Sequence, residues 1–226
     1  MLRHREAKAL LRNCLEGPSW REGAADVSRL GMGAVGPLLS FLPQGGRVKH
    51  RAARLLGEVV AALPSQEEGR NVVRRFMWHM NDESGNIGWG IPEAFGETLA
   101  ASASLAGEFH RILVSYVVDT GRQDNFCDNA ALRRSCFWAV GRMAEERLAL
   151  CRGARPWIVK GLGDGDGGCR AMAAWTLSRF PLDPAAASAL RKLAREEGDS
   201  TCELFDGDDV RERRVGDIVE EMLGEC

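Results

Sequence analysis

The sequence predicts an all-α fold in which about five helix pairs stack as an α-solenoid behind an N-terminal pair of helices. A twelve-residue amphipathic pattern recurs five times, at intervals of 37–45 residues, and a second helical segment precedes each copy. No segment alternates apolar and polar residues over the length of a strand, so we expect no sheet. Helix pairs repeated at this spacing bury a continuous core only when they stack on one another.

The first two predicted helices span about 2–16 and 19–31 and form an N-terminal cap over residues 1–32. Five repeats follow over 33–226, and we expect the whole chain, 1–226, to be a single repeat domain. The first helices of the five pairs have the sequences AVGPLLSFL, RNVVRRFMWHM, EFHRILVSYVVD, ARPWIVKGL and AAASALRKLAREE. Glycine, proline, asparagine and aspartate lie between these segments, as is typical of turns.

The second helices carry the recurring pattern, in which apolar residues follow one broad helical face. The five copies are VKHRAARLLGEV from Val48, IGWGIPEAFGET from Ile87, LRRSCFWAVGRM from Leu132, CRAMAAWTLSRF from Cys169 and VRERRVGDIVEE from Val210. Pro92 in the second copy is tolerated if that helix starts at about Gly90 or Ile91. A small residue near the end of four copies would allow close helix contact: Gly57, Gly96, Gly141 and Ser178.

This pattern of an apolar residue, a basic residue and paired alanines resembles HEAT repeats over residues 33–225. The resemblance is to the short bacterial form found in phycobilisome-lyase-like proteins. The segments NDESGNIGWG, FWAVGRM and ELFDGDDVRERRVGDI also resemble a small, uncharacterised group of HEAT-repeat proteins from anaerobic, notably sulfate-reducing, bacteria. The resemblance implies an armadillo-like α–α superhelix and no particular reaction.

Composition argues against several classes of function. The net charge is −2, whereas dedicated nucleic-acid binders carry a basic excess, so no nucleic-acid partner is expected. The longest charge-free runs are about half of the roughly 18–20 apolar residues that a bilayer span needs, so no membrane partner is expected either. The charged N-terminus lacks the apolar core of a signal peptide, and we expect a cytoplasmic protein.

No metal or cofactor site is predicted. The seven cysteines are scattered without a C-x-x-C pair, which is typical of reduced thiols in a cytoplasmic protein. The HEAT-repeat di-iron enzymes use His-Glu pairs, and no histidine here precedes a glutamate. Clustered carboxylates at Glu58, Glu93 and Glu97 leave acid–base chemistry open, but we expect a protein that is not an enzyme.

The repeat register indicates which side chains face the concave surface. The residue after the alanine pair, and the residue one turn later, should point away from the core. In the first four copies these predicted partner-binding residues are Arg54 and Glu58, Glu93 and Glu97, Trp138 and Arg142, and Trp175 and Arg179. Two outward tryptophans at equivalent positions would mark a contact site, because tryptophan and arginine dominate binding hot spots. The alternative is that these tryptophans lean onto the next helix and complete its packing.

A second candidate site is the segment MWHMNDESGNIGWGIPEAFGE, residues 77–97. Its glycines permit unusual backbone conformations, and its acids favour a cation, an amine or a basic peptide. The residues that we select as a candidate ligand loop are Asn81, Asp82, Glu83, Ser84 and Trp89. The alternative is that these residues only cap and plug the helix ends.

The leading hypothesis is therefore a non-enzymatic scaffold that binds a protein partner through its concave face. The alternative is small-molecule, metal or cofactor binding at residues 81–97, with catalysis left open. The sequence defines neither the partner nor the oligomeric state.

Overall fold

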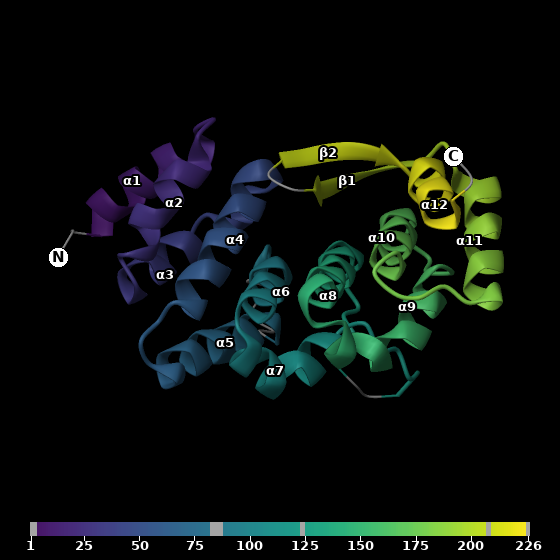
Figure 1. Ribbon diagram of the computed structural model, residues 1–226, viewed down its shortest axis with the longest axis horizontal. Helices are drawn as coiled ribbons and strands as arrows, with labels where there is room; N and C mark the ends of the chain where they lie inside the picture. Colours follow the sequence, from purple (N-terminus) through teal and green to yellow (C-terminus); the bar gives the residue numbers. More distant parts are fainter. Residues whose placement is uncertain (1–3, 82–87, 123–124, 207–208, 225–226) are drawn as a thin grey trace. The chain divides into compact units, whose positions relative to one another are not determined.

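The computed structural model describes residues 4–81, 88–122, 125–206 and 209–224. This part of the chain is predominantly helical and has the predicted all-α helical-repeat fold (Figure 1). The helices described are α1 (His4–Glu16), α2 (Trp20–Ser28), α3 (Met32–Leu39), α4 (Gly46–Ala61), α5 (Gln66–Met80), α6 (Ile91–Ala101), α7 (Ala103–Ser115), α8 (Ala130–Cys151), α9 (Arg155–Gly161), α10 (Gly167–Leu177), α11 (Pro184–Glu197) and α12 (Val215–Leu223).

The predicted helix pairs correspond to α3–α4, α5–α6, α7–α8, α9–α10 and α11–α12. Helix α6 begins at Ile91, directly after Gly90 in a left-handed conformation (φ 76°), so Pro92 lies in the first turn as predicted. Helix α10 begins after Asp166, whose side chain accepts a hydrogen bond from the Cys169 N–H and caps the helix. The starts of these helices are thus encoded locally.

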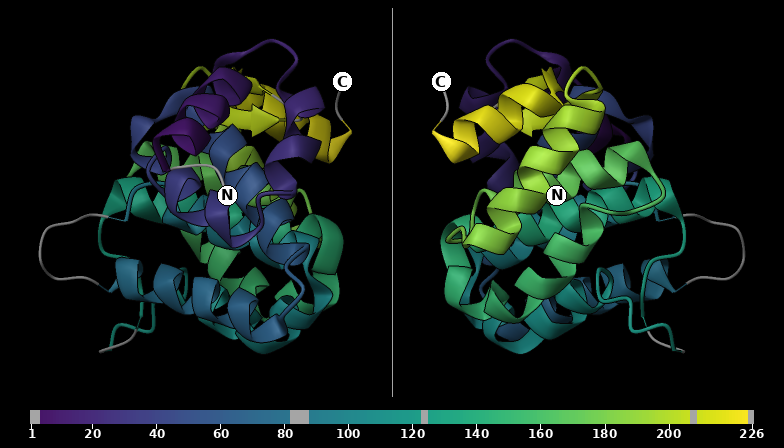
Figure 2. Two further views of the ribbon diagram at one scale, coloured as in Figure 1. Left: turned by 90° about the vertical axis from the view of Figure 1, so that its left-hand side faces the viewer. Right: turned by 90° about the vertical axis from the view of Figure 1, so that its right-hand side faces the viewer.

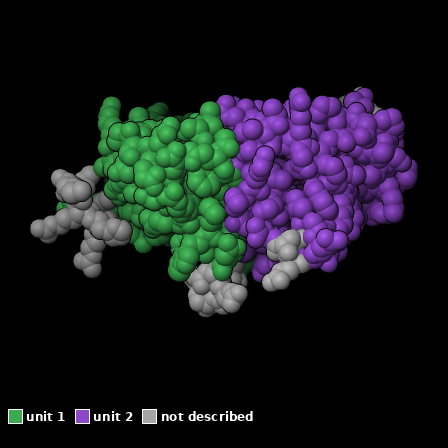
Figure 3. Space-filling model, turned by 90° about the horizontal axis from the view of Figure 1, so that it is seen from below, with its two compact units in different colours: residues 1–109 green, residues 110–226 purple. Residues whose placement is uncertain are grey.

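The chain divides into two compact units, residues 1–109 and 110–226, coloured separately in Figure 3. The first unit contains α1–α6 and the start of α7. The second contains the end of α7, helices α8–α12 and a β-hairpin. The expectation that 1–226 forms a single domain stays a prediction.

In unit 1 the inner helices α4 and α6 are in close contact, because Gly57 has no side chain. A Cβ built at Gly57 would lie 2.7 Å from the backbone carbonyl carbon of Glu97. The small residue predicted at this position is therefore confirmed as the point of close helix approach. Leu55, Leu56 and Val59 of α4 are fully buried in the same contact layer.

In unit 2 the inner helices α8 and α10 pack in the same way at Gly141, where an added Cβ would lie 2.5 Å from the Trp175 ring. The hydroxyl of Thr176 donates a hydrogen bond of 2.8 Å to the Phe137 carbonyl and ties the two helices together. Helix α12 lies beside α11 (Figure 2), and the Gly216 N–H donates to the Gly198 carbonyl at 3.0 Å.

The prediction of no sheet is wrong. Strands β1 (Thr201–Asp206) and β2 (Asp209–Arg214) form an antiparallel hairpin in which Thr201 pairs with Arg214 and Leu204 with Arg211. The fifth predicted helix therefore starts at Val215 and not at Val210. The missed signal is the dipeptide Gly-Asp at 207–208, which lies in the sequence between the paired residues Asp206 and Asp209 and is typical of a two-residue hairpin connection. An isolated two-stranded hairpin is marginally stable in water, so tertiary packing decides this structure.

Within the described ranges, no helix is long and apolar enough to cross a bilayer. Six cysteines fall in these ranges, and all six are free thiols.

We predict that Gly57→Ala destabilises the fold by about 1–3 kcal/mol, because the new methyl group overpacks the α4–α6 contact. The matched control is Gly107→Ala in α7, where an added Cβ meets nothing within 4 Å. That control should gain up to about 1 kcal/mol from improved helix propensity. Urea unfolding of both variants measures the difference, and equal stabilities would contradict the close packing of α4 on α6.

Candidate partner-binding surface

Seven of the eight predicted partner-binding residues lie on inner helices, and the eighth, Arg179, lies in the turn after α10; each unit contains four of the eight. Arg54 and Glu58 belong to α4 and Glu93 and Glu97 to α6 of unit 1. Trp138 and Arg142 belong to α8 and Trp175 and Arg179 to the end of α10 and the turn after it in unit 2. We expected all eight side chains to face solvent, but only some of them do.

In unit 1, Glu93 and Glu97 are buried, with 1% and 3% of their surface exposed, so the prediction that they face solvent is wrong. The physical reason is the close approach of α6 to α4, which leaves no open space between these helices. Lys49 Nζ donates a hydrogen bond of 2.6 Å to Glu93 Oε1, which pairs the buried carboxylate. Buried ion pairs of this kind constrain how elements pack more than they attract a distant ligand.

The neighbouring His50 is affected by the same burial. Burial, and then the positive charge of Lys49, lower the pKa of His50 to about 3, so its imidazole is neutral at pH 7. Arg54 and Glu58 remain partly exposed and lie 3.9 Å apart, and Arg21 approaches Glu58 to 4.0 Å. Arg54 and Glu58 therefore form the accessible charged part of the predicted surface in unit 1, and Arg21, which was not predicted, lies beside them.

In unit 2 the two tryptophans are also buried, with 3% and 5% of their surface exposed, so their predicted exposure is wrong as well. The rings of Trp138 and Trp175 stack on each other, with centroids 6.1 Å apart and an interplanar angle of 5°. We call this pair the Trp stack. The ring of Phe205, in β1, packs against Trp138 at 6.2 Å and covers it. The hairpin therefore accounts for the burial of Trp138, whereas Trp175 packs against Gly141 and is covered by Arg179.

Charged side chains surround the Trp stack. The guanidinium of Arg179 lies 3.8 Å from the Trp175 ring centroid, which is a cation–π contact. The same guanidinium is 2.8 Å from Glu145, and Arg142 is 3.0 Å from Glu145. Glu145 thus joins the two arginines that the register predicted, although sequence reasoning did not select it.

Leu204 and Phe205 of β1 are both buried, and Phe205 packs against Trp138 in α8 of the third helix pair. In the sequence this apolar pair lies between two acids, Glu203 and Asp206. The surface of α8 and α10 therefore already accommodates an extended segment of polypeptide.

The candidate ligand loop is only partly described. Asn81 is the C-cap residue of α5 and is exposed, whereas Asp82, Glu83 and Ser84 lie outside the described residues. Trp89 is 39% exposed. In the same region Trp78, which was not selected, is 65% exposed and packs edge-on against His79.

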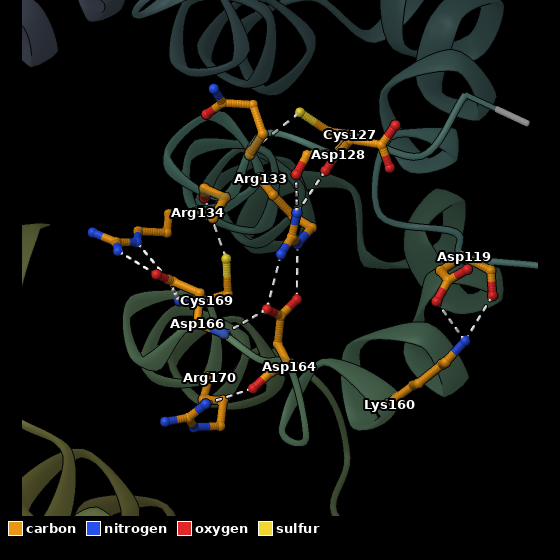
Figure 4. A network of polar contacts seen from close by, with 12 residues as sticks. Asp119, Cys127, Asp128, Arg133, Arg134, Lys160, Asp164, Asp166, Cys169 and Arg170 are labelled. Atoms are coloured by element: carbon orange, nitrogen blue, oxygen red, sulfur yellow. Dashed lines mark hydrogen bonds and ion pairs between the residues drawn. The ribbon is translucent and has the colours of Figure 1, made fainter. Parts of the chain in front are cut away.

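A polar network lies in unit 2 beside a cavity of about 300 Å³. Figure 4 shows Arg133 between the carbonyls of Cys127 and Asp128, at 2.8 and 2.9 Å, and the carboxylate of Asp164, at 2.8 and 2.9 Å. Lys160 donates to Asp119 at 2.7 Å on another side of the cavity. Its aromatic lining is Phe126, Phe137 and Trp157. This network positions the segment before α8 against the turn between α9 and α10.

The carboxylates of this network are held in their charged form. For Asp164, burial acts to raise the pKa, but hydrogen bonds from Arg133 and from the Asp166 N–H outweigh it, and the pKa is lowered. For Asp166, the hydrogen bond from Arg134 is the largest cause of a strongly lowered pKa. Among the described residues, no group of three or more His, Cys, Asp and Glu side chains could hold a metal ion.

Comparison with known proteins shows that the chain is similar in structure to solved proteins but does not assign it to a family. No family description matches the chain, and no curated protein matches it. Solved structures that resemble it include a designed armadillo repeat protein in complex with the peptide (KR)4, with 15% identity, a TM-score of 0.42, and 97% of this chain and 98% of that chain covered.

A computationally designed armadillo repeat protein for modular peptide recognition gives 14% identity and a TM-score of 0.46, with 97% and 99% covered. A further designed armadillo repeat protein gives 14% identity and a TM-score of 0.48 over the same shares of the two chains. At this level of likeness, no binding property transfers to the present chain. The resemblance to phycobilisome-lyase-like proteins and to the group from anaerobes stays a prediction.

We predict that Asp166→Asn lowers stability at pH 7 by about 0.5–1 kcal/mol, because it removes the charge partner of Arg134 while asparagine keeps the helix cap. A carboxylate whose pKa is lower in the folded state stabilises that state above its unfolded pKa of about 3.9, and the contribution is lost as the pH falls. The stability difference should therefore shrink from about pH 4 downward in urea unfolding measured at several pH values.

The matched control for this pH effect is Arg134→Gln. Asp166→Asn made in that background should cost less, and its cost should vary less with pH, because only the contacts with Cys169 then lower the pKa of Asp166. A pH dependence that is undiminished in the Arg134→Gln background would contradict the pairing.

Proposed function

We propose that this protein is a non-enzymatic helical-repeat scaffold that binds a segment of a protein partner on its inner helices. In unit 2 the contact surface is the Trp stack with Arg142 and Arg179. The observation that supports the proposal most directly is the packing of Phe205, from an extended strand, on Trp138. A surface that holds one extended segment has the shape and chemistry to hold another.

The chemistry of this surface favours binding over catalysis. Stacked indoles bury large apolar area, and tryptophan with arginine is the combination enriched at binding hot spots. The ion pairs that Glu145 makes with Arg142 and Arg179 provide a charged rim around the apolar centre. Strand β1 offers a template for the ligand: an apolar pair, Leu204 and Phe205, with an acid on each side.

A partner segment would replace β1 on the Trp stack. Detaching the hairpin exposes Leu204 and Phe205, which costs about 1.5–3 kcal/mol for each side chain. A partner that buries an equivalent aromatic residue offsets this cost, and additional contacts to Arg142 or Arg179 make binding favourable. In unit 1, Arg54 and Glu58 are the accessible residues that would contact a partner, whereas the buried Glu93 and Glu97 are not part of the proposed surface.

The test uses the chain with Leu204→Ala and Phe205→Ala, which weakens the attachment of its own hairpin. A fluorescent peptide with the sequence of residues 201–214, carrying Cys202→Ser to prevent dimerisation, should bind this variant with a Kd of about 10–100 µM. It should bind the unaltered chain more weakly, because the native hairpin competes. Fluorescence anisotropy measures both affinities, and far-UV circular dichroism verifies that the variant is folded.

The matched controls remove the aromatic contact from either side. A peptide with Phe205→Ala, or a protein that also carries Trp138→Ala, should lose at least about tenfold in affinity. A folded variant that does not bind the unaltered peptide, or binds all peptides equally, contradicts the proposal.

The second candidate function is binding of a small molecule, metal or cofactor beside residues 81–97. It is favoured by the exposure of two tryptophans of unit 1, Trp78 at 65% and Trp89 at 39%. Both lie at one end of the α5–α6 pair, because a Cβ added at Gly88, next to Trp89, would lie only 3.0 Å from the carbonyl oxygen of His79, next to Trp78. Exposed aromatic side chains gathered in one place are typical of a contact site.

This second function predicts a thermal shift of a few degrees with at least one member of a metabolite and metal panel. The shift should be lost in Trp89→Ala and retained in Met32→Ala, which removes an equally exposed apolar side chain from α3. A panel without any shift would argue against a ligand site here.

A further inference from the structure

We propose that Cys127 and Cys136 form a hydroperoxide-sensitive dithiol, in which Cys127 reacts first and Cys136 then closes a disulfide. Both residues belong to unit 2 and lie on the two sides of the N-terminus of α8. Cys127 precedes the N-cap residue Asn129, and Cys136 lies in the second turn of the helix. This pair has no part in the proposed binding of a protein segment on the Trp stack.

The geometry brings the two thiols together. The side chain of Cys127 interacts with that of Cys136, and both thiols interact electrostatically with the Tyr116 phenol. Cys127 Sγ also lies 3.7 Å from the carbonyl oxygen of Asn129, the N-cap residue of α8. The Cys127 N–H donates to the Tyr116 carbonyl at 3.0 Å, and the Cys127 carbonyl accepts from Arg133 at 2.8 Å. The backbone of Cys127 is therefore anchored on both sides, with its side chain beside the helix that carries Cys136.

The two cysteines differ in access to solvent in the way that a reacting thiol and a resolving thiol require. Cys127 is half-buried, whereas Cys136 is fully buried. Reactive cysteines lie in partly exposed sites near positive charge, and buried structural cysteines are inert. The guanidinium of Arg133 and the N-terminal end of α8 provide positive charge beside Cys127.

The electrostatics of the thiols agree with this assignment. The hydrogen bond with the Cys136 side chain lowers the pKa of Cys127 despite its partial burial, and the charge of Arg133 lowers it further. By contrast, burial raises the pKa of Cys14 and Cys202, and raises that of Cys151 and Cys169 to about 12. Cys127 should therefore carry the largest fraction of thiolate among these five cysteines.

The reaction balances with a hydroperoxide as the oxidant. The Cys127 thiolate attacks one peroxide oxygen, the O–O bond breaks, and the departing hydroxide takes a proton and leaves as water. Cys136 Sγ then attacks the sulfur of the resulting sulfenic acid, an S–S bond forms, and the S–O bond breaks. The second hydroxide leaves as water with the Cys136 proton, so two thiols lose two electrons in total.

The disulfide would tie two walls of the cavity together. Phe126 precedes Cys127, Phe137 follows Cys136, and both phenylalanines line the cavity described above. Oxidation would thus fix the segment before α8 on the helix itself, in addition to the contacts that Arg133 makes.

The test treats the full-length protein with hydrogen peroxide, blocks the remaining thiols and maps tryptic peptides by mass spectrometry. We expect peptides 123–133 and 135–142 to be joined by a bond that dithiothreitol reduces. The Cys127 thiol should be consumed about tenfold or more faster than the Cys202 thiol. Oxidation of Cys202 at the same rate, or a disulfide between any other pair, overturns the proposal.

Two variants separate the roles of the thiols. In Cys136→Ser the Cys127 sulfenic acid has no resolving partner and should be trapped by dimedone, whereas Cys127→Ser should give no dimedone adduct at Cys136. The control Cys202→Ser should form the 127–136 disulfide at the unaltered rate. Dimedone labelling at Cys136 in Cys127→Ser would contradict the assignment of Cys127 as the reacting thiol.

Discussion

Close contact between inner helices is the constraint on which both units depend. Gly57 in α4 faces the backbone of Glu97 in α6, and Gly141 in α8 faces the ring of Trp175 in α10. A side chain at either glycine would push the helices apart by more than a packed interior tolerates. Because the helices meet so closely, the side chains beside each contact are either buried between the two helices or extend to solvent at the edge of the helix–helix interface.

The burial of polar groups follows from this constraint. Glu93 enters the α4–α6 layer together with Lys49, and Arg133 is buried with Asp164 beside α8 and α10. A buried charge without a partner would cost several kcal/mol, so these residues are compatible with the fold only as pairs. Their contribution is to fix which helix faces lie against each other. Solvent-exposed ion pairs such as Arg29–Asp26 contribute little by comparison.

The hairpin helps to cover the two tryptophans, which would otherwise be exposed to solvent. On bare helices, Trp138 and Trp175 would expose a large apolar surface, which soluble proteins seldom leave open. Phe205 covers Trp138, and Arg179 covers the face of Trp175. The proposed binding surface is thus a covered surface, and access to it depends on how firmly the hairpin is held.

The sequence by itself determined the helices and their pairing, because amphipathic periodicity and local breakers such as Gly90 and Asp166 act over a few residues. It also identified the close approach at Gly57 and Gly141. The burial of Glu93, Trp138 and Trp175 was decided only by the tertiary structure, since burial depends on residues distant in the sequence. The β-hairpin was likewise decided by the tertiary structure. Its strands are too short to be stable alone, and its position depends on the contact between Phe205 and Trp138, which are 67 residues apart in the sequence.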